Sequence, residues 1–309
     1  MKISRKKIFW FLGLVIILII VVNFRLIYHR FIRPNKEMFP RFITDMISER
    51  EQRQAPSPIV YKEEKTLKIL EGWTIEDVRD YLVELGFAES DFNSLVGKAK
   101  VDYRKGGTYP MDFSERFAFL ADKPEYYSLE GFLFPDTYRV YASANTEDVI
   151  VKMLENFDKK LRPELREEIA RQGKSIYEII TMASLIEKEA PIDYSDPENK
   201  DARIVSGIFW GRLAIGQALE SDATLSYWFK DTNPAHSGEE LLVDTPYNSY
   251  KYRGLPPTPI CNPGIRAIEA AIYPIESDYN YFLTDLKGRN IYYAKTYQEH
   301  LNNKYKYLK

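Results

Sequence analysis

Cysteine and histidine are both scarce in this chain, and their scarcity excludes several kinds of site. Cys261 is the only cysteine among the 309 residues, so neither an intrachain disulfide nor a cysteine metal cluster can form. The three histidines, His29, His236 and His300, are too scattered along the sequence to suggest a metal site. We therefore expect neither metal ligands nor any cofactor, and a zinc or iron enzyme is disfavoured.

A large charge of one sign is also lacking. The formal net charge is only -2, although 28% of the residues are charged. A nucleic-acid-binding domain usually carries a clear basic excess, so we expect no nucleic-acid partner. The hydrophobic share of 45% is ordinary for a globular protein, and the length allows two small domains behind an N-terminal segment.

The first long apolar run lies at the N-terminus. Residues from Ile8 to Phe24 are uncharged and almost wholly apolar, and the run continues past Arg25 to Ile27. About 20 such residues span a bilayer. Basic residues precede the run and favour an N-terminus inside the cell, and no small residues mark a cleavage site after it. We predict a cytoplasmic tail over 1–7, a single uncleaved transmembrane helix over 8–27 and an extracytoplasmic remainder at the cell membrane.

The rest of the chain has the patterns of an α+β protein. Residues 28–58 are polar and proline-containing, which is typical of a stalk, and we predict a small α/β module over 59–125 and a larger mixed domain over 126–309. Proline and glycine predict turn-rich loops over 128–138 and 247–271. The periodicity predicts a strand near Leu67, a helix from Thr74 to Gly86, helices over 146–160, 163–172, 176–189 and 201–213, paired strands over 281–284 and 291–294, and a last helix from Gln298.

The helix over 176–189 carries the candidate catalytic residue. Ser175 and Glu178 form a capping box before an apolar run, and Pro191 closes the segment. At about 100° per residue, Glu187 lies within about 20° of Ile176 on the apolar stripe, whereas Thr181 and Ser184 lie towards the other side. A carboxyl among apolar side chains has a raised pKa and can act as a general acid. A half-exposed residue in a last helical turn is the structural alternative.

Several motifs together resemble the YceG-like (MltG) endolytic murein transglycosylases, from about Thr66 to the C-terminus. Their order and spacing carry the resemblance, which no single motif would do. They are Glu71-Gly72-Trp73-Thr74, the run from Leu129 to Tyr138, the run from Ala183 to Glu189, Ser221-Asp222, Tyr247-Asn248-Ser249-Tyr250, Gly254-Leu255-Pro256-Pro257, Asn262-Pro263-Gly264 and the run from Glu299 to Asn302. Glu220 and Gly211 depart from the family pattern, which usually has Gln and Asn there.

The resemblance implies a fold, an activity and a set of site residues. It implies a shortened LysM-like module over 59–125 and a catalytic domain over 126–309. It further implies a lyase that cleaves MurNAc-β-1,4-GlcNAc bonds within peptidoglycan strands, leaves 1,6-anhydro-MurNAc ends, and terminates or trims nascent strands beside the cell-wall synthesis proteins. Glu187 takes the position of the catalytic carboxyl, and Ser184, Asp222, Tyr247 and Asn248 are candidate substrate contacts.

Two other functions stay open at this point. A hydrolytic muramidase would use a second carboxylate, for which Asp222 is the candidate, and the spacing of two carboxyls cannot be obtained from sequence. A membrane-anchored, non-catalytic glycan-binding scaffold would need no general acid. The mass of the reaction product distinguishes a muramidase from a lytic transglycosylase, and a turnover assay distinguishes a non-catalytic scaffold from either enzyme.

Overall fold

The computed structural model describes residues 30, 38, 63–233, 236–285 and 290–308. The chain divides into two compact units, Met1–Tyr61 and Lys62–Lys309. The predicted tail, the transmembrane helix over 8–27 and nearly all of the stalk over 28–58 lie outside the described residues. Among the residues that are described, no helix has the length and apolar character needed to cross a membrane.

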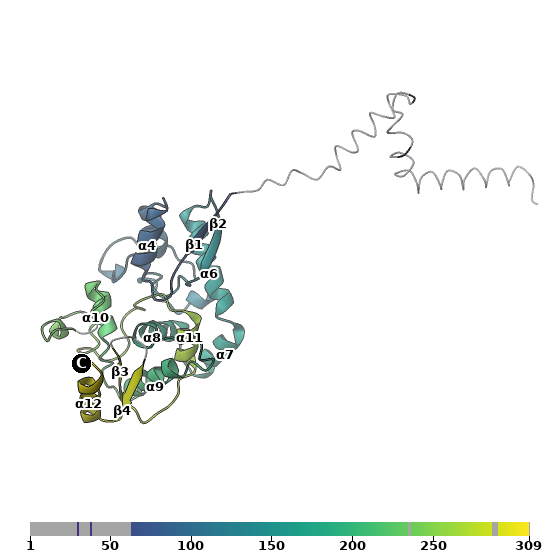
Figure 1. The fold of residues 1–309 in the computed structure, drawn as a ribbon. Helices are drawn as coiled ribbons and strands as arrows, with labels where there is room; N and C mark the ends of the chain where they lie inside the picture. The colour runs from purple at the N-terminus through teal and green to yellow at the C-terminus, as the bar shows by residue number, and fades with distance from the viewer. Residues whose placement is uncertain (1–29, 31–37, 39–62, 234–235, 286–289, 309) are drawn as a thin grey trace, which may run out of the picture. The chain divides into compact units, whose positions relative to one another are not determined.

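The second unit has short two-stranded sheets and many helices (Figure 1). Its first part contains β1 (Glu64–Lys68), α4 (Ile75–Glu84), α5 (Glu89–Val96), η3 (Tyr103–Lys105), η4 (Ala118–Leu120), β2 (Thr137–Tyr141), α6 (Thr146–Lys160) and α7 (Pro163–Arg171). Its second part contains α8 (Ile176–Glu189), α9 (Lys200–Ala214), α10 (Asp222–Phe229), η5 (Glu240–Leu242), α11 (Ile265–Ile272), β3 (Tyr281–Thr284), β4 (Ile291–Ala294) and α12 (Tyr297–Tyr307).

Helix α8 forms as predicted and lies at the centre of this unit, packed along α11 (Figure 1). Its capping box is complete, because Ser175 Oγ accepts from the Glu178 N–H and the Glu178 carboxylate accepts from the Ser175 N–H. Every residue from 179 to 186 is buried. The helix is therefore apolar almost all round, as expected of a helix in the middle of a core.

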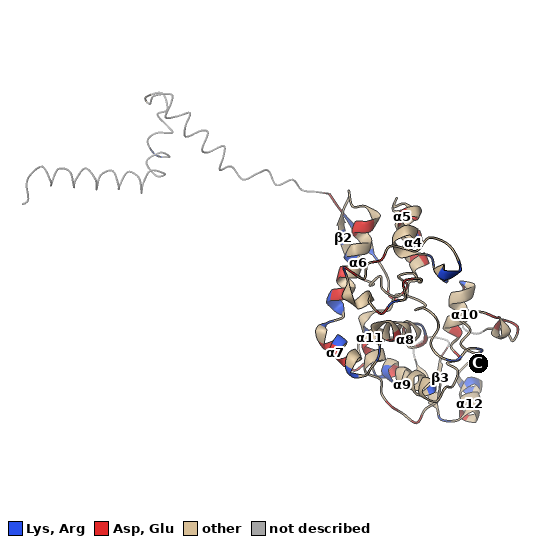
Figure 2. Ribbon diagram, turned by 180° about the vertical axis from the view of Figure 1, so that it is seen from behind, with Lys and Arg blue, Asp and Glu red and all other residues tan. Residues whose placement is uncertain are grey.

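Two polar residues of α8, Thr181 and Ser184, are buried too, although the helical wheel placed them away from the apolar stripe. Thr181 Oγ1 donates to the Tyr177 carbonyl at 2.8 Å, and Ser184 Oγ donates to the Thr181 carbonyl at 2.7 Å. These bonds satisfy the hydroxyls within the helix itself, so burial leaves no donor unpaired. Figure 2 shows charged residues of both signs on the outer helices α6 and α7, whereas the buried middle of α8 has none.

Both small sheets are antiparallel. β1 pairs with β2, with Leu67 opposite Tyr138, and β3 pairs with β4, with Tyr281 opposite Ala294. The second pair confirms the strands predicted over 281–284 and 291–294. The first pair joins a strand before residue 125 to a strand after it, and the domain boundary that the sequence suggested near that residue stays a prediction.

The sequence prediction was wrong in two loops and incomplete elsewhere. The loop over 128–138 ends earlier, because Thr137–Tyr141 alternates exposed and buried side chains and pairs with β1. The loop over 247–271 ends at Gly264, which is the N-cap of α11. The helices α5 and α10, each 8 residues long, were not predicted. Such short elements depend on tertiary packing more than on their own sequence.

Candidate active site

Glu187 lies in the last turn of α8 and is half-buried. Its Oε2 accepts a hydrogen bond of 3.0 Å from the Gly264 N–H. Burial raises the pKa of the Glu187 carboxyl to about 7, the Gly264 hydrogen bond opposes this shift, and the negative charge of Glu71 adds to it. Burial thus favours the protonated form of Glu187 well above the usual pH range of a carboxyl, and this is the state that a general acid needs.

Glu71 supplies a second carboxyl beside Glu187. Gly264 has no side chain, and a Cβ placed there would lie 2.1 Å from Glu71 Oε1, so the Glu71 carboxyl covers the position that a side chain would take. The Tyr194 hydroxyl donates to Glu71 Oε2. Gly264 thus lies against both carboxyls: its N–H donates to Glu187, and the space where a Cβ would stand is filled by Glu71. Its backbone is extended with φ -75°, so the requirement for glycine here is close approach rather than backbone strain.

Asn262 connects its own motif, Asn262-Pro263-Gly264, by hydrogen bonds to the motif at Gly72-Trp73 and to the run that starts at Leu129. Its Oδ1 accepts from the Gly131 N–H at 3.1 Å and from the Leu133 N–H at 2.9 Å, and its Nδ2 donates to the Trp73 carbonyl at 2.9 Å. The backbone of Asn262 adds a bond to Trp73 and one from Gly72. Asn262 has no exposed surface, so all these groups depend on one another for their hydrogen bonds.

The loop that begins at Leu129 fits against α8 because Gly131 lacks a side chain. Gly131 has φ +90°, which favours glycine, and a Cβ there would lie 2.6 Å from Pro259 and 2.9 Å from Ile180. The next residue back, Glu130, is fully buried and accepts from the Ile75 N–H and the Tyr227 hydroxyl. Burial raises the pKa of Glu130 to about 8. Its contacts join the start of α4 to α10.

Three of the residues predicted to contact the substrate make hydrogen bonds within the protein. Ser184 Oγ accepts from the Ile260 N–H, the Tyr247 hydroxyl pairs with Thr258 Oγ1, and Asn248 Nδ2 donates to two backbone carbonyls at 2.8 and 2.9 Å. All three side chains are buried. They hold the segments around residues 247 and 260 in place, and their contact with a substrate stays a prediction.

Asp222 and Glu189 meet at the start of α10, whereas Glu187 contacts Gly264. Asp222 is the first residue of α10, and its Oδ1 accepts from the Tyr250 hydroxyl at 2.9 Å. Glu189 Oε1 accepts from the Ser221 hydroxyl and, at 3.4 Å, from the Ala223 N–H, so it fixes the start of α10. Burial raises the pKa of Glu189 as well. The opposite placement of Glu187 and Glu189 follows from their separation of about 200° on the helix.

A broad cleft opens beside the last turn of α8. Its lining includes Thr74 and Glu76 near the start of α4, Lys188 and Glu189 from α8, Asp222 and Tyr227 from α10, Tyr281 and Phe282 from β3, and Tyr297 and His300 from α12. Glu187 lies next to this cleft on the Gly72 side, since a Cβ on Gly72 would lie 3.7 Å from Glu187 Cγ and 3.5 Å from Lys188 Nζ.

Sequence reasoning named Glu187 and missed the roles of Glu71, Glu130 and Asn262. All three stand inside the motifs that carry the family resemblance, so the motifs were the available signal. Nothing local in the sequence says that Glu71 comes to lie beside Glu187, because the contact depends on the bonds that Asn262 makes to Trp73 and Gly131.

Replacing Glu71 by Gln is expected to lower the pKa of Glu187. The Glu71 charge contributes to the raised pKa, whereas burial, the larger cause, remains in the variant. The acid holds its proton below its pKa, so activity should decline as pH rises through about 7 in the unmodified chain and at lower pH in Glu71→Gln. The measurement is kcat/KM against pH. Glu84→Gln, an exposed change on α4, is the control, and an unshifted profile in Glu71→Gln contradicts the coupling.

Comparisons with known proteins identify the family of the chain. A model of the YceG-like family matches residues 35–306. An endolytic murein transglycosylase of Streptococcus pneumoniae is 31% identical over 250 residues, which cover 77% of this chain and 44% of that protein. An endolytic murein transglycosylase of Bacillus subtilis is 35% identical over 181 residues, which cover 58% of this chain and 48% of that protein. The chain thus spans about half the length of the curated relatives that it matches.

A solved structure resembles the fold over most of its length. The crystal structure of a yceG-like protein from Listeria monocytogenes has a TM-score of 0.63 and 29% sequence identity, and the match covers 84% of this chain and 80% of that chain. The likeness confirms the mixed α+β fold class that the sequence patterns predicted.

Proposed function

The chain belongs to the YceG-like family, and from this membership we propose that it is an endolytic murein transglycosylase, a lyase of peptidoglycan. It cleaves the β-1,4 bond between MurNAc and GlcNAc inside glycan strands and leaves 1,6-anhydro-MurNAc ends. The observation that carries the proposal is the half-buried Glu187, whose pKa lies at about 7, at the point where the family's separate motifs meet. Two relatives that bear this activity in their names support it.

Glu187 acts first as an acid and then as a base. Its proton goes to the glycosidic oxygen as the bond to carbon 1 breaks, and positive charge develops on the sugar ring. The sugar's own 6-hydroxyl then bonds to carbon 1, and its proton passes to the Glu187 carboxylate. The acid is restored, and no water is consumed. The Gly264 N–H holds Oε2, which leaves Oε1 to carry the proton.

Burial is the main reason that Glu187 holds its proton at neutral pH, and the negative charge of Glu71 adds to this effect. Glu71 is a positioning residue in this mechanism, because it acts through Glu187 rather than on the sugar. The Tyr194 hydroxyl and the Gly264 backbone hold the Glu71 carboxyl in place. When the sugar closes a ring on itself, one carboxyl can carry out both proton transfers. Glu187 is that carboxyl, and Glu71 supports it.

The mass of the product tests the proposal. Glycan strands digested by the full chain should give fragments that end in 1,6-anhydro sugars, each lighter by one water than a hydrolytic fragment. Fragments of many lengths early in the digestion would support internal cleavage. Fragments with reducing ends, or the release of single terminal units only, would contradict the endolytic lyase.

A hydrolytic muramidase is the second candidate, and one observation favours it. Such an enzyme needs two carboxyls about the scissile bond. Glu71 lies beside Glu187, so it replaces Asp222 as the better candidate for the second carboxyl. We prefer the transglycosylase, because the family relatives carry that name.

We also propose that the chain is a single-pass protein of the cell membrane, with residues 8–27 as its anchor and the catalytic part outside the cytoplasm. The apolar run in the sequence supports this. Full-length protein should remain with the membrane after alkaline washing, and a soluble full-length chain would contradict the anchor.

The LysM-like nature of residues 59–125 rests on the family resemblance. Cosedimentation of the Glu187→Gln chain with insoluble peptidoglycan tests whether the chain holds glycan, and its absence would contradict this. Partners among the cell-wall synthesis proteins stay a prediction.

A further inference from the structure

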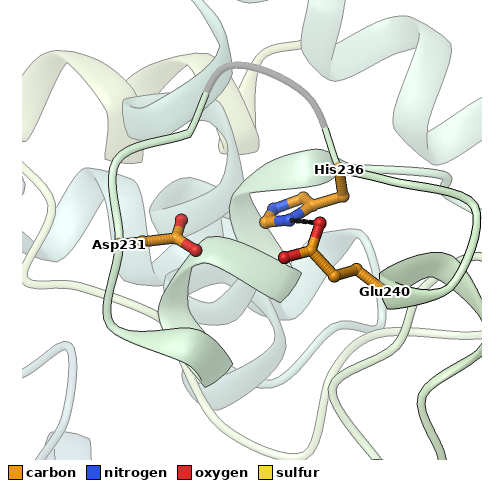
Figure 3. A group of neighbouring side chains, drawn as sticks. All are labelled: Asp231, His236 and Glu240. Carbon is orange, nitrogen blue, oxygen red and sulfur yellow. Dashed lines mark ion pairs between the residues drawn. The ribbon is translucent and has the colours of Figure 1, made fainter.

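Three side chains of metal-ligand type meet next to α10, away from Glu187. Asp231 follows the end of α10, His236 precedes η5, and Glu240 is the first residue of η5 (Figure 3). One ligand atom from each residue lies within 4.8 Å of the other two. In Figure 3 the imidazole stands between the two carboxylates, with the Glu240 carboxylate turned towards it.

Within the described part of the chain, one nitrogen of the His236 ring has no hydrogen-bond partner. Its Nε2 lies 3.2 Å from the Asp222 carbonyl oxygen and 3.1 Å from Ser226 Oγ. A carbonyl oxygen only accepts, so Nε2 donates to it, and in the neutral ring Nδ1 is then a lone pair. The side chain has no exposed surface, and Nδ1 has no hydrogen-bond partner among the residues that the structure describes. A buried acceptor without a donor needs a partner, and this one faces the carboxylates.

The spacing at this nitrogen suits an ion better than a hydrogen bond. His236 Nδ1 lies 3.6 Å from Glu240 Oε2, which is longer than a hydrogen bond. Two ligands at about 2.0–2.1 Å from one tetrahedral zinc ion lie about 3.4 Å apart. Small rotations of the Asp231 and Glu240 side chains are therefore enough to close a coordination shell around a common centre.

We propose that His236 Nδ1, an Asp231 carboxylate oxygen and a Glu240 carboxylate oxygen bind a divalent ion of the zinc class. Two carboxylates neutralise the charge of the ion, and an imidazole ligand selects zinc over magnesium or calcium. The Asp222 carbonyl then has the role of the outer partner that fixes the ring of a metal-bound histidine.

The carboxylates keep other bonds that are compatible with this role. The backbone N–H and the side-chain amide of Asn233 donate to Asp231 at 3.1 Å each, and the Ser237 N–H donates to Glu240 Oε2 at 2.7 Å. Each carboxylate oxygen has a second lone pair for a metal. Asp231 and His236 also line the cleft, so the ion would fix one wall of the cleft to α10. It takes no part in the proposed proton transfers.

Zinc titration of the full chain tests the site. The tag-free protein, stripped with a chelator and dialysed, should bind one zinc ion per chain in a calorimetric titration. His236→Gln should weaken binding at least about tenfold, since even the loss of an outer partner of a metal ligand costs that much. Asp231→Asn and Glu240→Gln should weaken it too. Cobalt added to the unmodified chain should give visible absorption bands that His236→Gln lacks.

Two controls separate this site from other zinc ligands. His300 also has an unpaired buried Nδ1, and Glu239 is an exposed neighbour of the cluster. His300→Gln and Glu239→Gln should bind zinc like the unmodified chain. If His236→Gln fails to fold by circular dichroism, the two carboxylate variants carry the test. The proposal is overturned if the unmodified chain takes up no stoichiometric zinc, which favours a simple His236–Glu240 ion pair, or if the cluster variants bind it undiminished.

Discussion

Replacing Glu187 by Gln is expected to leave the chain folded and to remove nearly all turnover. The amide has the shape of the acid and can still accept from the Gly264 N–H, but it cannot give a proton to the glycosidic oxygen. Losing a general acid costs about 10² to 10⁴ in rate. The loss should reach or exceed the upper end here, because one carboxyl serves both proton transfers. The measurement is the initial rate of glycan cleavage, with circular dichroism to confirm folding.

Glu189→Gln is the matched control for this prediction. Glu189 lies on the same helix, and burial raises its pKa too, but its carboxylate accepts from Ser221 and Ala223 rather than from Gly264. The amide can keep those bonds, so the turnover of this variant should stay far above that of Glu187→Gln. Equal losses in the two variants would mean that the end of α8 matters for structure rather than for proton transfer.

Replacing Asn262 by Ala should cause the largest loss of stability of any single change discussed. The variant leaves the buried N–H groups of Gly131 and Leu133 without an acceptor and removes one bond to Trp73. Each unpaired buried group costs about 1–3 kcal/mol, so the free energy of unfolding should fall by several kcal/mol. Chemical denaturation measures this. Turnover should fall as well, because Gly264, two residues on, holds Glu187.

Asn302→Ala is the control for Asn262→Ala. Asn302 is exposed on α12 and accepts only one side-chain bond, from Gln298. A surface change of this kind usually alters stability by less than about 0.5 kcal/mol. If Asn262→Ala has the same unfolding free energy as Asn302→Ala, the bonds around Asn262 do not hold the motifs together.

Local signals predicted the central helix well. Ser175, Glu178 and Pro191 mark its ends, and α8 runs over the predicted residues. The same kind of signal located α6 and the pair of β3 with β4. Short elements without such signals were lost. β2 has only 5 residues, and it forms because β1 lies opposite it, which no local pattern records.

The candidate site was predictable only in part, for a related reason. Periodicity places Glu187 on α8, because the helix fixes which residues share a face. The contact of Glu71 with Gly264 joins residues that lie far apart in the chain, and the bonds of Asn262 do the same. The cluster at His236, for which we propose a metal ion, lay outside the sequence argument, because that argument counted only cysteines and histidines and the other two members are carboxylates.

Cleavage in water labelled with heavy oxygen tests the central claim most directly, which is that Glu187 drives an internal ring closure without water. Mass spectrometry of the new strand ends should find no label in products of the unmodified chain, a mass lower by one water than that of a reducing end, and almost no product from Glu187→Gln. Incorporation of one labelled oxygen per cleavage would contradict the ring closure and identify a hydrolytic muramidase, and near-normal cleavage by folded Glu187→Gln would contradict the role of Glu187.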